Sequence, residues 1–165
     1  MKYEFTGQVK VVGGITFRQI RALVAIASIG VAAGEVGGWV EKDGNLSQNG
    51  NAWVSGNARV SGNARVSGDA QVSGDAQVYG NAQVSGNGLI FWASKVGTEN
   101  GTLTVYNTKD STLQVTRGCF IGTVDEFLAA SERRQDDDTH FEYRLLIEVA
   151  HSRIARARAK LEGGQ

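Results

Sequence analysis

The stretch GNARVSGNARVSGDAQVSGDAQVYGNAQVSG, which runs from Gly56 to Gly86, repeats itself every six residues. Valine recurs at every sixth position from Val54 to Val84, and alanine does so from Ala52 to Ala82. Residues two positions apart on a strand point to the same face, so the valine and alanine columns share one face. The Arg or Gln between them points the other way. The repeat therefore predicts short strands with one apolar and one polar face.

A single strand of this length cannot bury its apolar face, but stacked coils can, because the valines of successive coils form one continuous core. Gly-Asn and Gly-Asp pairs turn the corners, since glycine, asparagine and aspartate tolerate the backbone conformation that tight turns need. Three sides of six residues make a coil of 18 residues. The six valines give two such coils, and Leu46 and Ile90 are expected to add about one more.

The hexads, for example Val66-Ser-Gly-Asp-Ala70-Gln71, resemble those of the left-handed parallel β-helix (hexapeptide-repeat) proteins. The left hand is implied by this resemblance, because general crossover rules predict the opposite hand. The segments GEVGGWVEKDGNLSQNGNAWVSGNA (34–58) and GCFIGTVDEF (118–127) resemble a group of small uncharacterised hexapeptide-repeat proteins of bacterial and phage genomes. The resemblance implies N-terminal strands, a short β-helix, and then a hairpin and helices.

The predicted fold class is mainly β: a short left-handed parallel β-helix with N-terminal strands, a C-terminal hairpin and two α-helices. Gly13-Gly14 predicts a turn between two strand-like runs, and GTLTVYN (101–107) with STLQVTRG (111–118) predicts a hairpin with one buried face. We expect one compact domain with four zones. These are an N-terminal strand cap at 1–40, the β-helix repeat at 41–92, the β-hairpin at 93–122 and the C-terminal helices at 123–165.

Two helices are predicted in the last zone. Thr123 and Glu126 have the spacing of a capping box, which begins a first helix at Val124. Asp138 or Thr139 is expected to cap a second, longer helix that ends before Gly163. Its apolar residues follow three-to-four spacing and predict a stripe that faces inward or toward a partner. They are Tyr143, Ile147, Ala150, Ile154, Ala157 and Leu161.

Composition limits the classes of function. Lys and Arg total 17, as do Asp and Glu, so the formal net charge is zero, which argues against a general polyanion binder. The single cysteine, Cys119, excludes an internal disulfide and fits a reducing compartment. The apolar run at 22–33 is far shorter than the ~20 residues that span a bilayer. We expect a cytoplasmic protein without membrane contact, in the host cytoplasm if the chain is phage-encoded.

Catalysis is not the expected function. Many left-handed β-helix proteins are trimeric acyltransferases with a histidine base in a groove between subunits, and such a base must reach the acceptor. The histidines of this chain, His140 and His151, both fall in the predicted helices. A zinc site of the carbonic-anhydrase type needs three histidines. We therefore predict no catalytic residue, metal or cofactor, with an acyltransferase-like enzyme as the alternative.

The polar columns are the candidate binding surface. At 18-residue spacing Arg59 stacks on Gln77, Arg65 on Gln83 and Asn57 on Asp75. One interpretation is a solvated polar face. The other is a groove between subunits of a homotrimer, where guanidinium groups bind an anion or phosphate and a ring stacks on a base. The candidate residues are Trp53, Asn57, Arg59, Arg65 and Tyr79.

The predicted function is thus a non-catalytic binding or scaffold protein. In a phage-encoded form it would capture a host nucleotide signal or a protein partner, as a counter-defence device. A second alternative is nucleic-acid binding through the basic run of Arg153, Arg156, Arg158 and Lys160, although cations near a helix C-terminus also suit the helix dipole. Trp39 and Trp92, which flank the repeat, are interpreted as plugs over the open ends of the prism.

Overall fold

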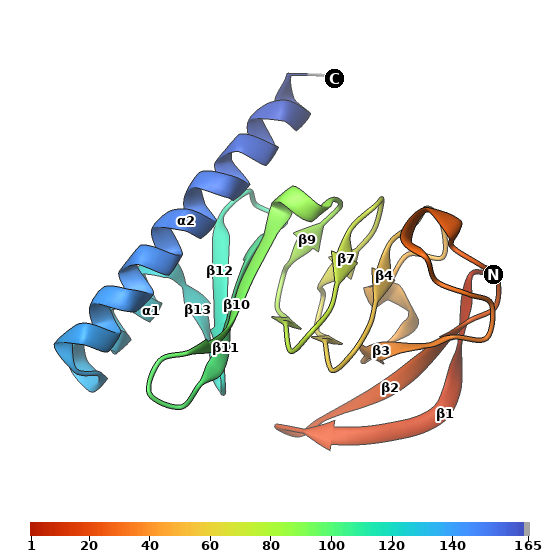
Figure 1. Ribbon diagram of the computed structural model, residues 1–165, viewed down its shortest axis with the longest axis horizontal. Helices are drawn as coiled ribbons and strands as arrows, with labels where there is room; N and C mark the ends of the chain where they lie inside the picture. The colour runs from red at the N-terminus through yellow and green to blue at the C-terminus, as the bar shows by residue number, and fades with distance from the viewer. Residues whose placement is uncertain (164–165) are drawn as a thin grey trace. The chain divides into compact units, whose positions relative to one another are not determined.

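The computed structural model describes residues 1–163 and divides into two compact units, Met1–Asn87 and the segment from Gly88 onward. The first unit holds an N-terminal antiparallel hairpin and the repeat, and the second holds a four-stranded antiparallel sheet and both α-helices (Figure 1). None of the helices in the described part of the chain is both long and apolar enough to cross a membrane.

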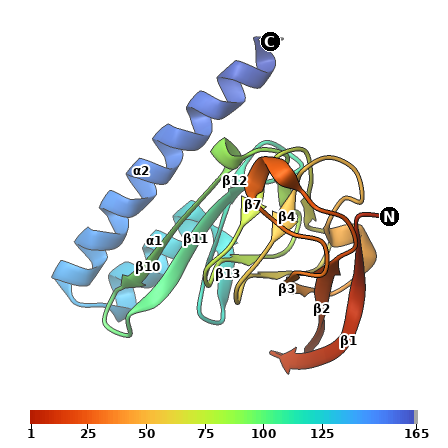
Figure 2. The ribbon, with the colours of Figure 1, turned by 45° about the vertical axis from the view of Figure 1, so that its right-hand side comes forward.

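The repeat forms a stack of parallel two-residue strands. Trp53 pairs with Gln71, Arg59 with Gln77 and Arg65 with Gln83, so the predicted 18-residue coil is confirmed. Figures 1 and 2 show the coils as stacked loops within this unit. The strands are β4 (Trp53–Val54), β5 (Arg59–Val60), β6 (Arg65–Val66), β7 (Gln71–Val72), β8 (Gln77–Val78) and β9 (Gln83–Val84).

The interior of the coils consists of the two predicted apolar columns. All six repeat valines are fully buried, and the repeat alanines are at most 2% exposed. The corners turn at glycines with positive φ; at Gly68 (φ 61°) a Cβ would also collide with the carbonyl oxygen of Ser85 on the next coil. Only glycine therefore fits this corner without strain.

The ladder begins before the six regular hexads. β3 (Val36–Val40) pairs in parallel with β5, Trp39 opposite Arg59 and Val40 opposite Val60. A short helical turn, η2 (Asp43–Asn45), follows, and Leu46 then forms a parallel bridge to Val66. Leu46 therefore adds to the coils, as expected. The expectation for Ile90 was wrong: it begins a strand of the second unit and pairs with Tyr106.

An N-terminal hairpin extends one side of the coil stack. β1 (Tyr3–Val12) and β2 (Ile15–Ala22) are antiparallel, and the predicted turn at Gly13-Gly14 is present. β2 also pairs with β3, which gives a five-stranded sheet in the order β1-β2-β3-β5-β8. A turn of helix, η1 (Ala27–Ile29), interrupts the connection from β2 to β3.

The second unit is an antiparallel sheet with two helices. Its strands are β10 (Ile90–Val96), β11 (Gly101–Asn107), β12 (Leu113–Arg117) and β13 (Phe120–Thr123), in that order. β11 and β12 form the predicted hairpin, with Val105 opposite Val115. A helical turn, η3 (Asn87–Leu89), precedes β10.

The helices are α1 (Val124–Arg134) and α2 (Asp137–Glu162). The capping box of Thr123 and Glu126 is present, whereas the cap of α2 is Asp136, whose carboxylate accepts the Thr139 N–H at 2.7 Å. The cap predicted at Asp138 or Thr139 is therefore wrong by two or three residues. The predicted apolar stripe of α2 packs inward from Tyr143 to Ile154, but Leu161 is 63% exposed.

Candidate anion-binding site

One face of the five-stranded sheet gathers cations and aromatic rings. Strand residues alternate between faces, so Val40, Val60 and Val78 point into the coils and the residues before them point outward. The outward column is Trp39, Arg59 and Gln77, which are neighbours in the parallel ladder.

The N-terminal hairpin adds Lys10 and Phe17 to this face. Lys10 lies directly opposite Phe17 in the β1–β2 pair, and paired residues of a sheet share a face. The Lys10 Nζ lies over the indole of Trp39, 4.2 Å from the ring centroid. The Arg59 guanidinium lies 5.7 Å from the centroid of Phe17. Two cations thus each contact an aromatic ring on one surface.

Tyr79, at the corner after β8, completes the group. Its ring centroid is 6.2 Å from that of Phe17, which is fully buried. Lys10, Trp39, Arg59 and Tyr79 are each half-buried. We call Lys10, Phe17, Trp39, Arg59 and Tyr79 the Lys10–Arg59 cluster.

The two cations of the cluster affect the pKa values of its titratable side chains. Burial lowers the pKa of the Lys10 ammonium, and the positive charge of Arg59 lowers it further. Burial raises the pKa of Tyr79, an effect that Arg59 partly offsets. No salt bridge recorded among residues 1–163 involves Lys10. An anion between Lys10 and Arg59 would relieve their repulsion.

The residues predicted from the sequence do not form one site. Arg59 and Tyr79 belong to the cluster. Asn57 lies at an exposed corner, where its Nδ2 donates to Asp75 Oδ1 at 3.3 Å. Arg65 lies on another side of the coil and donates weakly to the Gly44 carbonyl at 3.4 Å. Trp53 is 2% exposed, so its ring has no open face for a ligand in this chain.

Three members of the cluster were missed as site residues. The interpretation of Trp39 as an end plug is wrong, because Trp39 occupies the outward column beside Arg59. A signal existed: Trp39-Val40 repeats the outward–inward order of Arg59-Val60. Lys10 and Phe17 had no such signal, since they lie on a distant hairpin. Trp92 lies on β10 opposite Thr104, in the second unit.

The second unit has a hollow of its own, of about 230 Å³. Arg117 and Arg134 line it beside Phe127, and Cys119 lies at its rim on the exposed turn between β12 and β13. The Arg117 Nε donates to the Tyr143 hydroxyl at 3.1 Å, and a weaker contact of 3.5 Å joins Arg117 to Glu99.

The two histidines both lie on α2, outside the coils. His140 Nδ1 shares a hydrogen bond of 3.0 Å with the Ser131 hydroxyl of α1, and His151 is exposed. Among the described residues, no group of three or more His, Cys, Asp or Glu side chains has a geometry that could hold a metal ion.

The parallel ladder and the buried valine column define the chain as a mainly β protein of the β-solenoid repeat class. A family model described as the YdcK beta solenoid repeat matches residues 52–68, 58–74 and 70–86. These matches cover the six hexad strands, roughly a fifth of the chain, and indicate similarity in the repeat itself. A comparison with curated proteins finds no match.

Proposed function

We propose that this chain is a non-catalytic binding protein whose Lys10–Arg59 cluster holds a small phosphate-bearing ligand of the nucleotide class. The single observation that carries the proposal is the placement of two cations over two aromatic rings on one face of the β1-β2-β3-β5-β8 sheet. A phosphate would accept hydrogen bonds from both cations, and such charge-assisted bonds are about twice as strong as neutral ones.

The aromatic members supply the second half of the recognition. A nucleotide base has a π-face that stacks on Trp or Tyr, with a typical value of about 1–3 kcal/mol per base. The Trp39 indole and the Tyr79 ring are half-buried, so each keeps part of its surface for such a contact. The pairing of cation and ring at the same site favours a nucleotide over inorganic phosphate.

The proposal also includes the oligomeric state of the protein and the handedness of its coil. We propose a left-handed hexapeptide-repeat β-helix that forms a homotrimer, as the resemblance of the hexads implies. In a trimer the outward columns would face a neighbouring subunit, which would bury the ligand further. In a phage-encoded chain, capture of a host nucleotide signal would act as a counter-defence in the host cytoplasm.

Isothermal titration with a panel of mono-, di- and cyclic nucleotides tests the proposal. Arg59→Gln places in β5 the residue that β8 carries one coil later, so it removes the charge and keeps a side chain that this ladder accepts. Arg65→Gln is the matched control on another side of the coil. We expect Arg59→Gln and Lys10→Met to weaken binding by about tenfold or more, and Arg65→Gln to leave it unchanged. Absence of heat with the whole panel would contradict the proposal.

The two alternatives have less support. An acyltransferase of the usual kind would need a histidine in the coils, and the sequence has none between residues 41 and 92. In the basic run of α2, Arg158 already donates to Asn107 Oδ1 at 2.7 Å, within its own unit. We therefore prefer a binding function at the Lys10–Arg59 cluster.

A further inference from the structure

α2 carries a second apolar stripe, on the face opposite its packed side. Phe141 is 58% exposed, and Leu145 and Val149 are each 47% exposed. A spacing of four residues keeps these three side chains on one face of a helix. The inward stripe of Tyr143, Ile147, Ala150 and Ile154 is at most 5% exposed, so the inward packing of α2 is complete without the second stripe. A continuous exposed stripe of this kind marks a surface that binds a partner.

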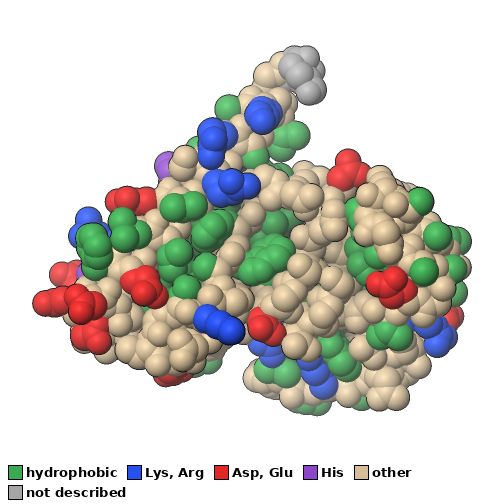
Figure 3. All heavy atoms as spheres, viewed as in Figure 1, with side chains coloured by type: hydrophobic (Ala, Val, Ile, Leu, Met, Phe, Trp, Pro, Cys, Tyr) green, Lys and Arg blue, Asp and Glu red, His purple; other side chains and the backbone are tan. Residues whose placement is uncertain are grey.

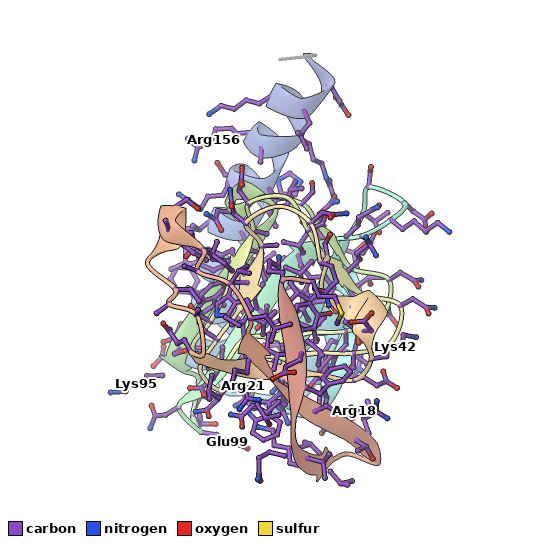
Figure 4. The ribbon with its side chains drawn as sticks, turned by 90° about the vertical axis from the view of Figure 1, so that its right-hand side faces the viewer. Arg18, Arg21, Lys42, Lys95, Glu99 and Arg156 are labelled. Carbon is purple, nitrogen blue, oxygen red and sulfur yellow. The ribbon has the colours of Figure 1, made fainter. Side chains whose placement is uncertain are left out.

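The charges of α2 divide into two opposite halves. The first thirteen residues, 137–149, carry four acidic side chains and one arginine. The last thirteen, 150–162, carry four basic side chains and one glutamate. Figure 3 shows acidic side chains gathered at the N-terminal end of α2 and basic ones along its C-terminal part. Arg156 extends outward from the helix (Figure 4).

We propose that the exposed stripe of α2 docks on the same stripe of a second copy of this chain, with the two helices antiparallel. An antiparallel arrangement sets the acidic half of each helix against the basic half of the other, and it also opposes the helix dipoles favourably. A parallel arrangement would set like charges side by side. A membrane surface is a poorer occupant, since helices that lie on membranes are basic along their polar face.

The length of α2 fixes the register. Full overlap of two 26-residue helices places the two-fold axis beside Val149, near the middle of the Asp137–Glu162 span. Val149 then meets its own copy, as a two-fold interface requires. Leu145 comes opposite Arg153, whose aliphatic stem can cover it, and Asp138 comes opposite Lys160. Arg153, Asp138 and Lys160 are all exposed in the single chain.

This pairing is independent of the nucleotide site. If the coils assemble a given number of chains, a two-fold contact through α2 doubles that number. Light scattering after size exclusion therefore tests the proposal through the mass. We expect the Leu145→Glu, Val149→Glu double variant to have half the mass of the wild type, with unchanged nucleotide binding. Val11→Glu, at a 67% exposed position on β1, is the control and should leave the mass unchanged.

Cross-linking tests the direction of the pair. In a Cys119→Ser background, Val149→Cys places two thiols at the axis, where they should form a disulfide. Phe141→Cys places the thiols eight residues from the axis, about 24 Å apart along the helices, which is beyond disulfide reach. A parallel pair or a three-fold bundle of α2 would cross-link both variants equally. That result, or an unchanged mass in the double glutamate variant, would overturn the proposal.

Discussion

The indole of Trp53 fills the space that a side chain at Gly37 would need. A Cβ at Gly37 would lie 2.8 Å from Cζ2 of Trp53 and 2.7 Å from the carbonyl oxygen of Val54. Cγ1 of Ile20, on β2, would be equally near, at 2.8 Å. The glycine therefore lets β3 and the N-terminal hairpin pack closely on the coil, which is why Trp53 is buried although it precedes an inward-pointing valine.

Gly37→Ala should accordingly destabilise the first unit. The added methyl group meets backbone and two packed side chains, and overpacking of this kind typically costs about 1–3 kcal/mol in the free energy of unfolding. Urea denaturation followed by tryptophan fluorescence measures the change. Gly44→Ala is the matched control, because nothing lies within 4 Å of its Cβ and its φ is not positive. Equal midpoints for the two variants would show that Trp53 is not held by Gly37.

The coil could be predicted from the sequence because its geometry repeats. Six residues per side and three sides fix the pairing of Arg59 with Gln77 before any coordinate is known. Each hexad also carries its own corner residues, so a wrong assignment of one hexad would not change the predicted register of the next.

The cluster could not be predicted, because it depends on a pairing that no period encodes. The β1–β2 register shifts between Phe5 and Val9, and the β2–β3 register shifts between Gln19 and Arg21. Lys10 and Phe17 pair regularly next to the turn, but no repeat in the sequence tells that β2 pairs with β3, and this pairing is what brings Lys10 to Trp39. The burial of Trp53 was missed for the same reason, since the covering residues come from other strands.

Lys2 gives the first unit a pH dependence in the alkaline range. Its Nζ donates to the Ala52 carbonyl at 2.6 Å inside the protein, and burial lowers the pKa of this ammonium to about 8. The ordinary pKa of a lysine is 10.5. Between these values the unfolded chain binds more protons than the folded one, so stability should rise with pH. Below pH 8 both states are protonated and Lys2 contributes no slope.

Urea midpoints at pH 7.5, 8.5 and 9.5 measure this effect. After allowance for partial solvent screening we expect a rise of about 1–2 kcal/mol in the free energy of unfolding. The range stops at pH 9.5 because burial raises the pKa of Tyr3. At higher pH this tyrosine ionises in the unfolded chain before it does so in the folded one, which lowers the free energy of unfolding. Lys2→Met should flatten the curve, although the lowered pKa of Lys10 leaves a smaller slope. Lys42→Met, at an exposed position, should keep the slope of the wild type. If stability rises with pH as steeply in Lys2→Met as in the wild type, Lys2 is not the source of the pH dependence.

Arg158 and Arg156 lie on the same part of α2 but differ in their contacts. Arg158 Nε donates to Asn107 Oδ1 at 2.7 Å, and its Nη2 donates to the Thr112 carbonyl at 2.6 Å. Arg156 is exposed, and its Nε donates to the Ser152 carbonyl of its own helix at 3.4 Å. Hydrogen bonds from charged groups typically contribute about 1.5–3 kcal/mol each.

The bond to the Thr112 carbonyl is exposed to water and contributes little, so Arg158→Ala should lower the free energy of unfolding of the second unit by about 1.5–3 kcal/mol, the value of the part-buried bond to Asn107. Arg156→Ala should change it by less than about 0.5 kcal/mol. Thermal unfolding followed by helical circular dichroism measures both. Arg158→Lys keeps the charge but loses the two-pronged geometry, so its stability should lie between that of Arg158→Ala and the wild type. Equal losses for the two alanine variants would mean that Arg158 does not fasten α2 to the sheet, and the basic run would then be free as a whole for an anionic partner.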